Sequence, residues 1–183
     1  MAERFTEALE RIREGSEDWS REENLRELSN PSPDEAEAFA RVWFALDDAV
    51  RFQLANRLAD LADEHATLAY EALFDVLLQD EMPAIRTTAI SQLWEVMDDA
   101  LAERLLWLLR NDPASEVRAE AATALGAFVW NVQGEEGDSR AFRREVEDAL
   151  LEVYNTPAED VLVRQRALEA YAYSDDPFVD EIL

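Results

Sequence analysis

Three pairs of adjacent aspartates are of a residue type that could support catalysis: Asp47 and Asp48, Asp98 and Asp99, and Asp175 and Asp176. Two carboxylates that converge across a cleft act as acid and base in glycoside hydrolysis. Here, however, every pair falls at a predicted helix start or turn, where a carboxylate caps exposed backbone N–H groups and interacts favourably with the helix dipole. We therefore interpret the pairs as local helix caps and predict no catalytic residue.

The single histidine, His65, follows Asp63 and Glu64 between two predicted helices, a grouping that could suggest a metal site or an acid/base pair. One histidine cannot supply a multi-histidine metal site, and a loop histidine beside solvated carboxylates is more often a surface residue. The sequence also lacks the usual phosphate-loop, calcium-loop, zinc-protease and serine-hydrolase motifs. We predict no metal site, no cofactor and no enzymatic activity.

The charge balance narrows the classes of partner. Of the 183 residues, 42 are acidic and 17 are basic, which gives a formal net charge of -25, and every basic residue is an arginine. Nucleic acid is disfavoured as a partner because a phosphate backbone requires basic residues to neutralise it. An acidic surface would attract a basic protein or peptide, but adaptation to high salt or the codon usage of a GC-rich genome explains it equally well.

The N-terminal segment and the absence of cysteine bear on location. The chain is charged from its third residue, and no uninterrupted apolar run approaches the ~18 residues of a membrane span. Without cysteine there are no disulfides and no reason to expect an oxidising compartment. We therefore expect a cytoplasmic protein that is not secreted and does not enter a membrane.

Four segments of the chain superimpose without gaps. Each has apolar residues at positions i, i+4 and i+8 and an arginine at i+1, and the segments are 50–58, 85–93, 117–125 and 163–171. This spacing places the apolar residues on one face of a helix. Successive arginines lie 35, 32 and 46 residues apart, so the first two spacings suit one helical hairpin and the last includes an extra loop.

Breaker residues precede the last three segments, at 80–83, 111–113 and 155–157. A proline near the first turn of a helix costs no hydrogen bond, and a polar residue before it suits the N-cap, so we predict helix starts there. Each of the four repeat helices is preceded by another amphipathic stretch, at 34–46, 67–78, 98–110 and 140–154.

These helix pairs predict a single repeat domain over 1–183. Its expected parts are a capping hairpin at 1–30, repeats at 34–62, 66–97, 98–130 and 140–173, an acidic loop at 131–139, and the start of a further, truncated helix at 174–183. A repeat array normally ends in a polar cap, so Phe178, Ile182 and Leu183 suggest either a truncated chain or a terminus that packs on another surface, for which self-association through the C-terminal end is one expectation.

The pattern of Asp, Pro, a spacer, Val-Arg, then Ala and Leu resembles HEAT repeats, particularly the short HEAT-like units of phycobilin lyases and of uncharacterised bacterial HEAT-repeat proteins. The clearest copy is 109–126. The resemblance implies an all-α fold, a right-handed α-α superhelix of the armadillo/HEAT solenoid type. It also implies a structural ladder formed by Arg51, Arg86, Arg118 and Arg164 with Asp80 and Asp112. In the fourth unit Asp160 is displaced past its proline, which predicts an incomplete ladder there.

The outward positions of the repeat helices indicate a binding surface. Residues at i+2, i+6, i+9 and i+13 point away from the core, toward the inner surface of a curved stack. Exposed aromatic residues rimmed by polar groups suit a protein interface because aromatics dominate binding hot spots. The predicted protein-binding residues on this concave face are Phe52, Asn56, Thr87, Ser91, Trp94, Thr123, Trp130, Gln165, Glu169 and Tyr173. For Trp130, at a helix end, an inward orientation is the alternative.

Four other aromatics sit in apolar stripes and are predicted to be core: Trp43, Phe44, Trp107 and Phe128. The resulting functional prediction is a non-enzymatic scaffold or adaptor that holds a protein or peptide on its concave face. HEAT-like repeats also occur in lyase subunits and DNA glycosylases, so a ligand-handling enzyme that uses Glu95 or Asp60 is one alternative. A structural subunit of a larger assembly is another.

Overall fold

The computed structural model describes residues 2–93, 98–131, 138–175 and 179, and the regular secondary structure within these ranges is entirely α-helical. The chain forms two compact units, Met1–Leu93 and Trp94–Leu183. The all-α prediction is confirmed, as is the HEAT-type class of fold. Over the described residues, no helix is both long enough and apolar enough to cross a membrane.

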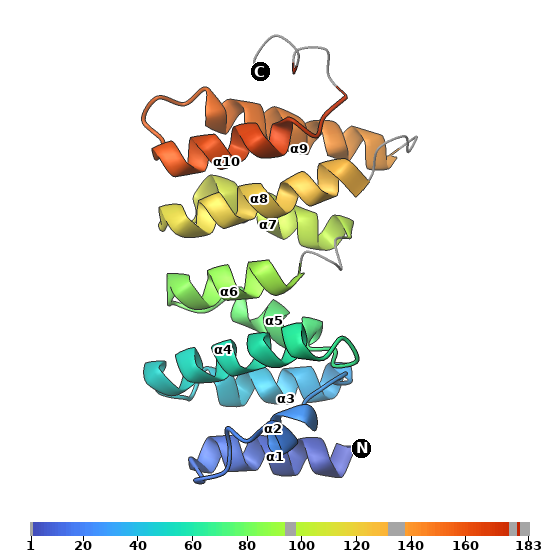
Figure 1. The fold of residues 1–183 in the computed structure, drawn as a ribbon, viewed down its shortest axis with the longest axis vertical. Helices are drawn as coiled ribbons and strands as arrows, with labels where there is room; N and C mark the ends of the chain where they lie inside the picture. Colours follow the sequence, from blue (N-terminus) through green and yellow to red (C-terminus); the bar gives the residue numbers. More distant parts are fainter. Residues whose placement is uncertain (1, 94–97, 132–137, 176–178, 180–183) are drawn as a thin grey trace. The chain divides into compact units, whose positions relative to one another are not determined.

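The first unit places its helices in two layers (Figure 1). In one layer α3 packs on both α1 and α5, while α6 packs on α5 and on its neighbour α4. The helices are α1 (Ala2–Glu14), α2 (Glu22–Arg26), α3 (Pro33–Trp43), α4 (Asp48–Glu64), α5 (Glu71–Leu77) and α6 (Pro83–Leu93).

The second unit has the same two-layer arrangement of helices. These are α7 (Asp99–Asn111), α8 (Ser115–Asn131), α9 (Asp138–Tyr154) and α10 (Val161–Tyr171). The helices α8 and α10 lie side by side in one layer, and α7 and α9 pack behind them in the other (Figure 1). The first helix of each predicted pair therefore lies in one layer and the second in the other.

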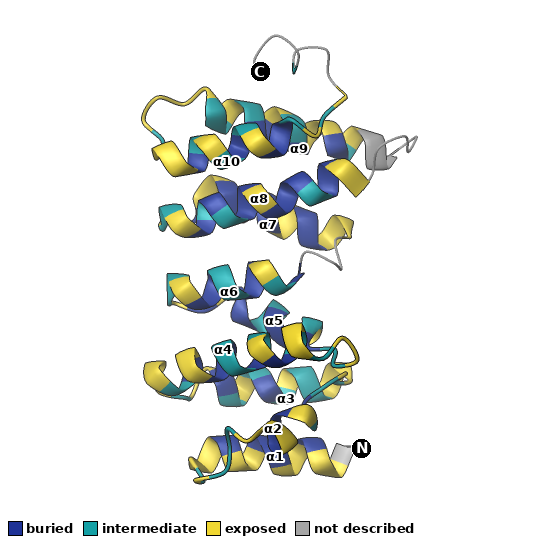
Figure 2. Ribbon diagram, in the orientation of Figure 1, coloured by how far each residue is buried: buried dark blue, intermediate teal, exposed yellow. Residues whose placement is uncertain are grey.

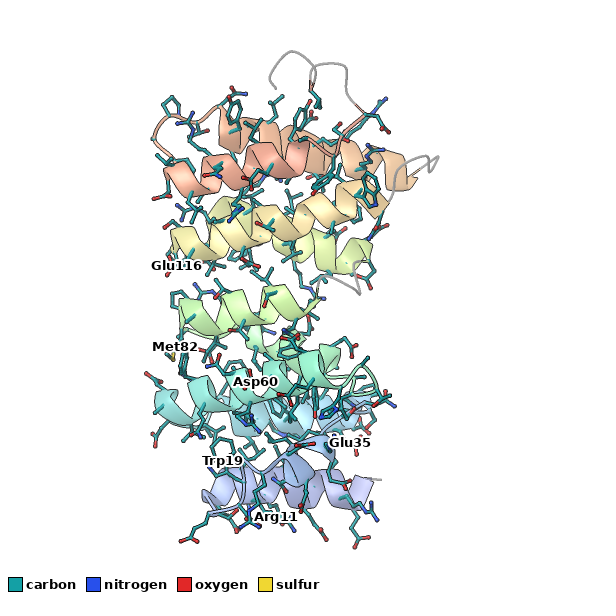
Figure 3. All side chains as sticks on the ribbon, in the orientation of Figure 1. Arg11, Trp19, Glu35, Asp60, Met82 and Glu116 are labelled. Atoms are coloured by element: carbon teal, nitrogen blue, oxygen red, sulfur yellow. The ribbon has the colours of Figure 1, made fainter. Side chains whose placement is uncertain are left out.

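Local side-chain chemistry fixes several helix starts. Before α3, the Ser32 hydroxyl accepts a hydrogen bond from the Glu35 N–H, and the Glu35 carboxylate accepts one from the Ser32 N–H at 2.8 Å. Figure 3 labels Glu35 in this capping box. Asp98 caps α7 by accepting from the Leu101 N–H at 2.8 Å, as its place in an acidic pair predicted. In contrast, the Asp47 side chain caps no N–H group of α4 among the described residues.

The turn aspartates accept hydrogen bonds from the residues that directly precede their helices. The Asp80 carboxylate accepts from the Met82 N–H at 2.8 Å, and the Asp112 carboxylate accepts from the Ala114 N–H at 2.9 Å. Such turns hold the backbone that leads into α6 and α8. The third breaker, at 155–157, behaves differently, because α10 begins at Val161, beyond Pro157, with Asp160 as its N-cap.

The apolar positions of the repeat segments form the core. In the last three segments all the residues at i, i+4 and i+8 are buried: Ile85, Ala89, Leu93, Val117, Ala121, Leu125, Val163, Ala167 and Tyr171. Figure 2 shows the buried positions on the sides of the helices that face their neighbours. In the first segment Leu54 and Leu58 are buried. The predicted core face is therefore the observed one.

Two aromatic side chains that were predicted to be core are exposed. Trp43 and Phe128 are buried, but Phe44 is 49% exposed and Trp107 is 61% exposed. Phe44 is the C-cap of α3, so it has left the helical stripe that buries Trp43. Trp107 lies on the face of α7 opposite its buried leucines, since each residue advances about 100° around the helix.

Candidate functional site

Two of the repeated arginines hold the first unit together. The Arg51 Nε lies 3.3 Å from the Asp80 carboxylate, which also accepts a hydrogen bond from the Trp43 indole at 2.8 Å. Arg86 donates to the backbone carbonyls of Asp80 and Glu81 at 2.7 and 3.0 Å. All these charged side chains except Glu81 are buried, and a buried charge persists only when it is paired and hydrogen-bonded. Arg51, Arg86 and Asp80 therefore stabilise the fold of the first unit rather than form a binding site.

The second unit contains an ion pair of the same kind, in which Arg118 has a partner, Glu159, that the sequence did not predict. Arg118 donates to the Asp112 carbonyl at 2.7 Å and to both carboxylate oxygens of Glu159, at 3.1 and 2.6 Å. These bonds raise the pKa of the Arg118 guanidinium and lower the pKa of the Glu159 carboxyl. The predicted gap at Asp160 is wrong, because the longer Glu159 side chain reaches the arginine while Asp160 caps α10. Arg164 donates instead to the Tyr154 carbonyl at 2.8 Å.

His65 and Asp60, which were considered for catalysis, each contact other charged side chains. His65 contacts Arg26 at 2.8 Å and Glu22 at 3.3 Å. Asp60, labelled in Figure 3, is exposed and lies 3.4 Å from the Arg57 guanidinium. Glu95 lies outside the described residues. Among the described residues, no three His, Cys, Asp or Glu side chains gather closely enough to hold a metal ion.

The predicted binding residues of the first unit lie on α4 and α6. Phe52 is 43% exposed, and Asn56 donates to the Phe52 carbonyl at 2.8 Å. The hydroxyls of Thr87 and Ser91 donate to carbonyls of their own helix, at 2.9 and 2.8 Å. Trp94 lies outside the described residues. The exposed apolar side chain of this set is therefore Phe52, beside polar groups engaged with their own backbone.

The predicted binding residues of the second unit surround a groove between α8 and α10. Four of them line it, and Gln165 lies one helical turn before Glu169 on α10. The groove has a volume of about 670 Å³. Its lining residues are Thr123, Gly126, Ala127, Trp130, Asn131, Arg166, Glu169, Ala170 and Tyr173. We call this feature the α8–α10 groove.

Small residues form the floor of the α8–α10 groove. A Cβ atom added to Gly126 would lie 3.1 Å from the Cα and Cβ of Ala170 and 3.3 Å from the Tyr173 ring. Ordinary carbon–carbon contacts are about 3.5–4.0 Å, so the two helices approach more closely than a larger side chain would allow. This close approach brings together Trp130 at the end of α8 and Tyr173 just beyond α10.

Two exposed aromatic rings form one wall. Trp130 and Tyr173 lie 5.9 Å apart between ring centroids, with their planes at 73°. Such an edge-to-face arrangement is favourable for aromatic pairs. Trp130 is nevertheless 60% exposed and Tyr173 is 49% exposed. The inward orientation considered for Trp130 is therefore wrong, and both rings present apolar surface to solvent.

The polar side of the groove is formed by the Glu169 carboxylate, which accepts hydrogen bonds from two neighbouring side chains. Glu169 accepts hydrogen bonds from Gln165 at 2.8 Å and from Arg166 at 2.7 Å, which lower the pKa of its carboxyl. Glu169 is therefore ionised at neutral pH. Half-buried Glu120, on α8, has its pKa raised by burial, an effect that the positive charge of Arg166 opposes. Arg166 is thus influenced by two carboxylates.

Five residues that line the α8–α10 groove were not predicted from the sequence: Gly126, Ala127, Asn131, Arg166 and Ala170. One signal was present, because a glycine inside a helical pattern often marks a close approach of another helix. Nothing in the sequence, however, identified Ala170 as the residue that Gly126 meets.

Comparison with known proteins gives one match. A family model described as HEAT repeats matches residues 70–172, which is more than half of the chain. No curated protein and no solved structure matches.

Proposed function

Because this chain belongs to the HEAT-repeat family, we propose that it is a non-enzymatic scaffold or adaptor that holds a peptide segment of another protein in the α8–α10 groove. HEAT repeats are commonly protein-interaction scaffolds. Binding of this kind requires no catalytic residue, only a preformed surface with apolar anchors and a polar rim. A cytoplasmic location fits this role and stays a prediction.

The observation that carries the proposal is the exposed aromatic pair. Trp130 and Tyr173 keep about half or more of their surface in solvent while their rings hold each other in place. Tryptophan and tyrosine are enriched in binding hot spots because they bury much apolar area when a partner covers them. The pair therefore supplies the anchor that a peptide segment needs.

The polar residues around the pair favour a peptide over a purely apolar ligand. Thr123, Asn131 and Glu169 line the same groove, and side chains of these types hydrogen-bond to backbone or side-chain groups of a peptide. The groove lies between two helices and its aromatic residues Trp130 and Tyr173 are exposed, so a peptide segment can reach them from solvent.

A selection experiment tests the proposal. A phage-displayed library of short random peptides is panned on the wild type, and the enriched peptides are measured by fluorescence anisotropy against two variants. The Trp130→Ala, Tyr173→Ala double variant removes the aromatic wall. The Trp107→Ala variant is the matched control, because Trp107 is equally exposed but lies on α7.

We expect the double variant to bind at least roughly 30-fold more weakly, the loss that corresponds to a hot-spot residue, and Trp107→Ala to bind as the wild type does. If no peptide is enriched, or if both variants bind equally well, the α8–α10 groove is not the binding site. The contribution of Phe52, Asn56, Thr87 and Ser91 is a separate prediction, which Phe52→Ala tests in the same assay.

A further inference from the structure

From the charges around the aromatic wall we infer that the α8–α10 groove recognises a cationic side chain, a lysine or arginine of the bound segment, held against Trp130 and Tyr173 with Glu169 as counter-charge. This inference rests on the proposed function and deepens it by specifying the partner's chemistry. It would make the ligand a basic segment rather than an apolar one.

The aromatic wall has the geometry that a cation needs. Two rings at 73° with centroids 5.9 Å apart form a corner, and both rings are open to solvent. A cation within about 6 Å of an aromatic centroid is attracted by the electron-rich face of the ring, most strongly for tryptophan. A side chain that enters this corner can contact one ring face with its head and the other ring with its aliphatic stem.

Arg166, an arginine that lines the groove, is already paired and does not occupy the cation position between the two rings. Arg166 is hydrogen-bonded to Glu169 and also lies within the influence of Glu120. This trio sums to one negative charge when both carboxyls are ionised. The local charge shared by α8, through Glu120, and α10, through Arg166 and Glu169, therefore favours a cation.

A second group of charges joins α9, through Arg143 and Glu147, to Asp175 in the segment after Tyr173. Arg143 lies 3.0 Å from the Glu147 carboxylate and 3.2 Å from the Asp175 carboxylate, so two carboxylates again share one guanidinium. The Ser174 hydroxyl donates to Glu147 at 2.8 Å, which ties the segment after Tyr173 to α9. Arg143, Glu147 and Asp175 also sum to one negative charge when both carboxyls are ionised, and Asp175 lies two residues after Tyr173.

The charge of the whole chain acts in the same direction. With a formal net charge of -25, the protein attracts basic segments at long range and repels acidic ones. An apolar segment would gain nothing from this field. A basic segment gains both the long-range attraction and the local contacts, which is why we commit to it as the occupant.

The test extends the peptide selection. Peptides whose binding depends on Trp130 and Tyr173 are sequenced, and each arginine or lysine in them is replaced in turn by the neutral analogues citrulline or norleucine. Binding is then measured at low and high salt with the wild type, with Glu169→Gln, and with Glu103→Gln. The last variant is the charge-matched control, because Glu103 is an exposed carboxylate on α7.

We expect enrichment of lysine or arginine at one position, and a loss of roughly 5- to 30-fold when that residue is neutralised, the range of a cation–π contact. Glu169→Gln should weaken binding and reduce its salt dependence, while Glu103→Gln should do neither. Groove-dependent peptides without a required cation would overturn this inference and leave the proposed function intact. If no groove-dependent peptide is found, both fail.

Discussion

The Arg118–Glu159 pair offers a direct test of the structural ladder. Two Arg–Glu pairs in the second unit have similar lengths: Arg118–Glu159, at 2.6 Å, joins α8 to the turn before α10, and Arg166–Glu169, at 2.7 Å, lies within α10. Their burial differs, because the side chains of the first pair are each 17% exposed while those of the second are 43% and 49% exposed. Replacing each glutamate by glutamine removes the charge and keeps the shape.

We expect Glu159→Gln to lower the free energy of unfolding by roughly 1–2 kcal/mol, because a mostly buried guanidinium then has two neutral acceptors, the glutamine amide oxygen and the Asp112 carbonyl, in place of a carboxylate. Glu169→Gln should cost clearly less than Glu159→Gln, because exposed ion pairs contribute little to stability. Urea unfolding of both variants at neutral pH gives the two values. Equal losses would refute the reasoning, because they would show that burial does not decide the strength of these pairs.

Acid adds an independent check on the same pair. The pKa of the Glu159 carboxyl is lowered in the folded chain from an ordinary value of 4.5. A carboxyl with a lowered folded-state pKa contributes its full stability above the unfolded-state pKa and loses it as the pH falls through the folded-state pKa. The free energies of unfolding of the wild type and Glu159→Gln should therefore begin to converge as the pH falls below about 4.5.

Three further predictions concern single sites. Trp43→Phe removes the indole donor to buried Asp80, so urea unfolding should show a loss of roughly 1–3 kcal/mol, and an unchanged midpoint would contradict that bond. Gly126→Leu should push α10 away from α8, lowering the melting temperature and abolishing peptide binding, whereas normal binding would contradict the close approach. Burial raises the pKa of Tyr70 to about 12, so in an ultraviolet titration its phenol should ionise well after an exposed one. Because the unfolded chain releases that proton first, stability should fall as the pH rises from 10 toward 12.

The repeat helices were predictable because their burial is one-sided. An apolar residue every fourth position makes a stripe that a neighbouring helix covers, and the stripes at 85–93, 117–125 and 163–171 are buried as predicted. The stripe prediction was wrong for Phe44, at the end of α3, and for Trp107, on the outer face of α7. Phe44 is exposed because α3 stops at Trp43, and helix ends depend on cap geometry that hydrophobic spacing does not contain.

The partners of side chains were less predictable than the helices. By resemblance, the displaced Asp160 predicted an incomplete ladder at the fourth unit, yet the neighbouring Glu159 supplies the missing partner of Arg118. The α8–α10 groove was partly predicted, through Thr123, Trp130, Glu169 and Tyr173. Its floor was not, since the contact of Gly126 with Ala170 joins residues of two helices whose register the sequence does not specify.

The indole N–H resonances of the tryptophans test groove binding most directly. Trp130 lines the groove, whereas buried Trp43 donates to Asp80 and exposed Trp107 lies on α7, so the three indoles report on three different places. When a selected peptide is titrated into the ¹⁵N-labelled protein, the Trp130 signal should shift and saturate with the peptide's affinity, while those of Trp43 and Trp107 stay in place. A shift of the Trp107 signal with Trp130 unmoved would place binding on another surface and contradict the proposed role of the α8–α10 groove.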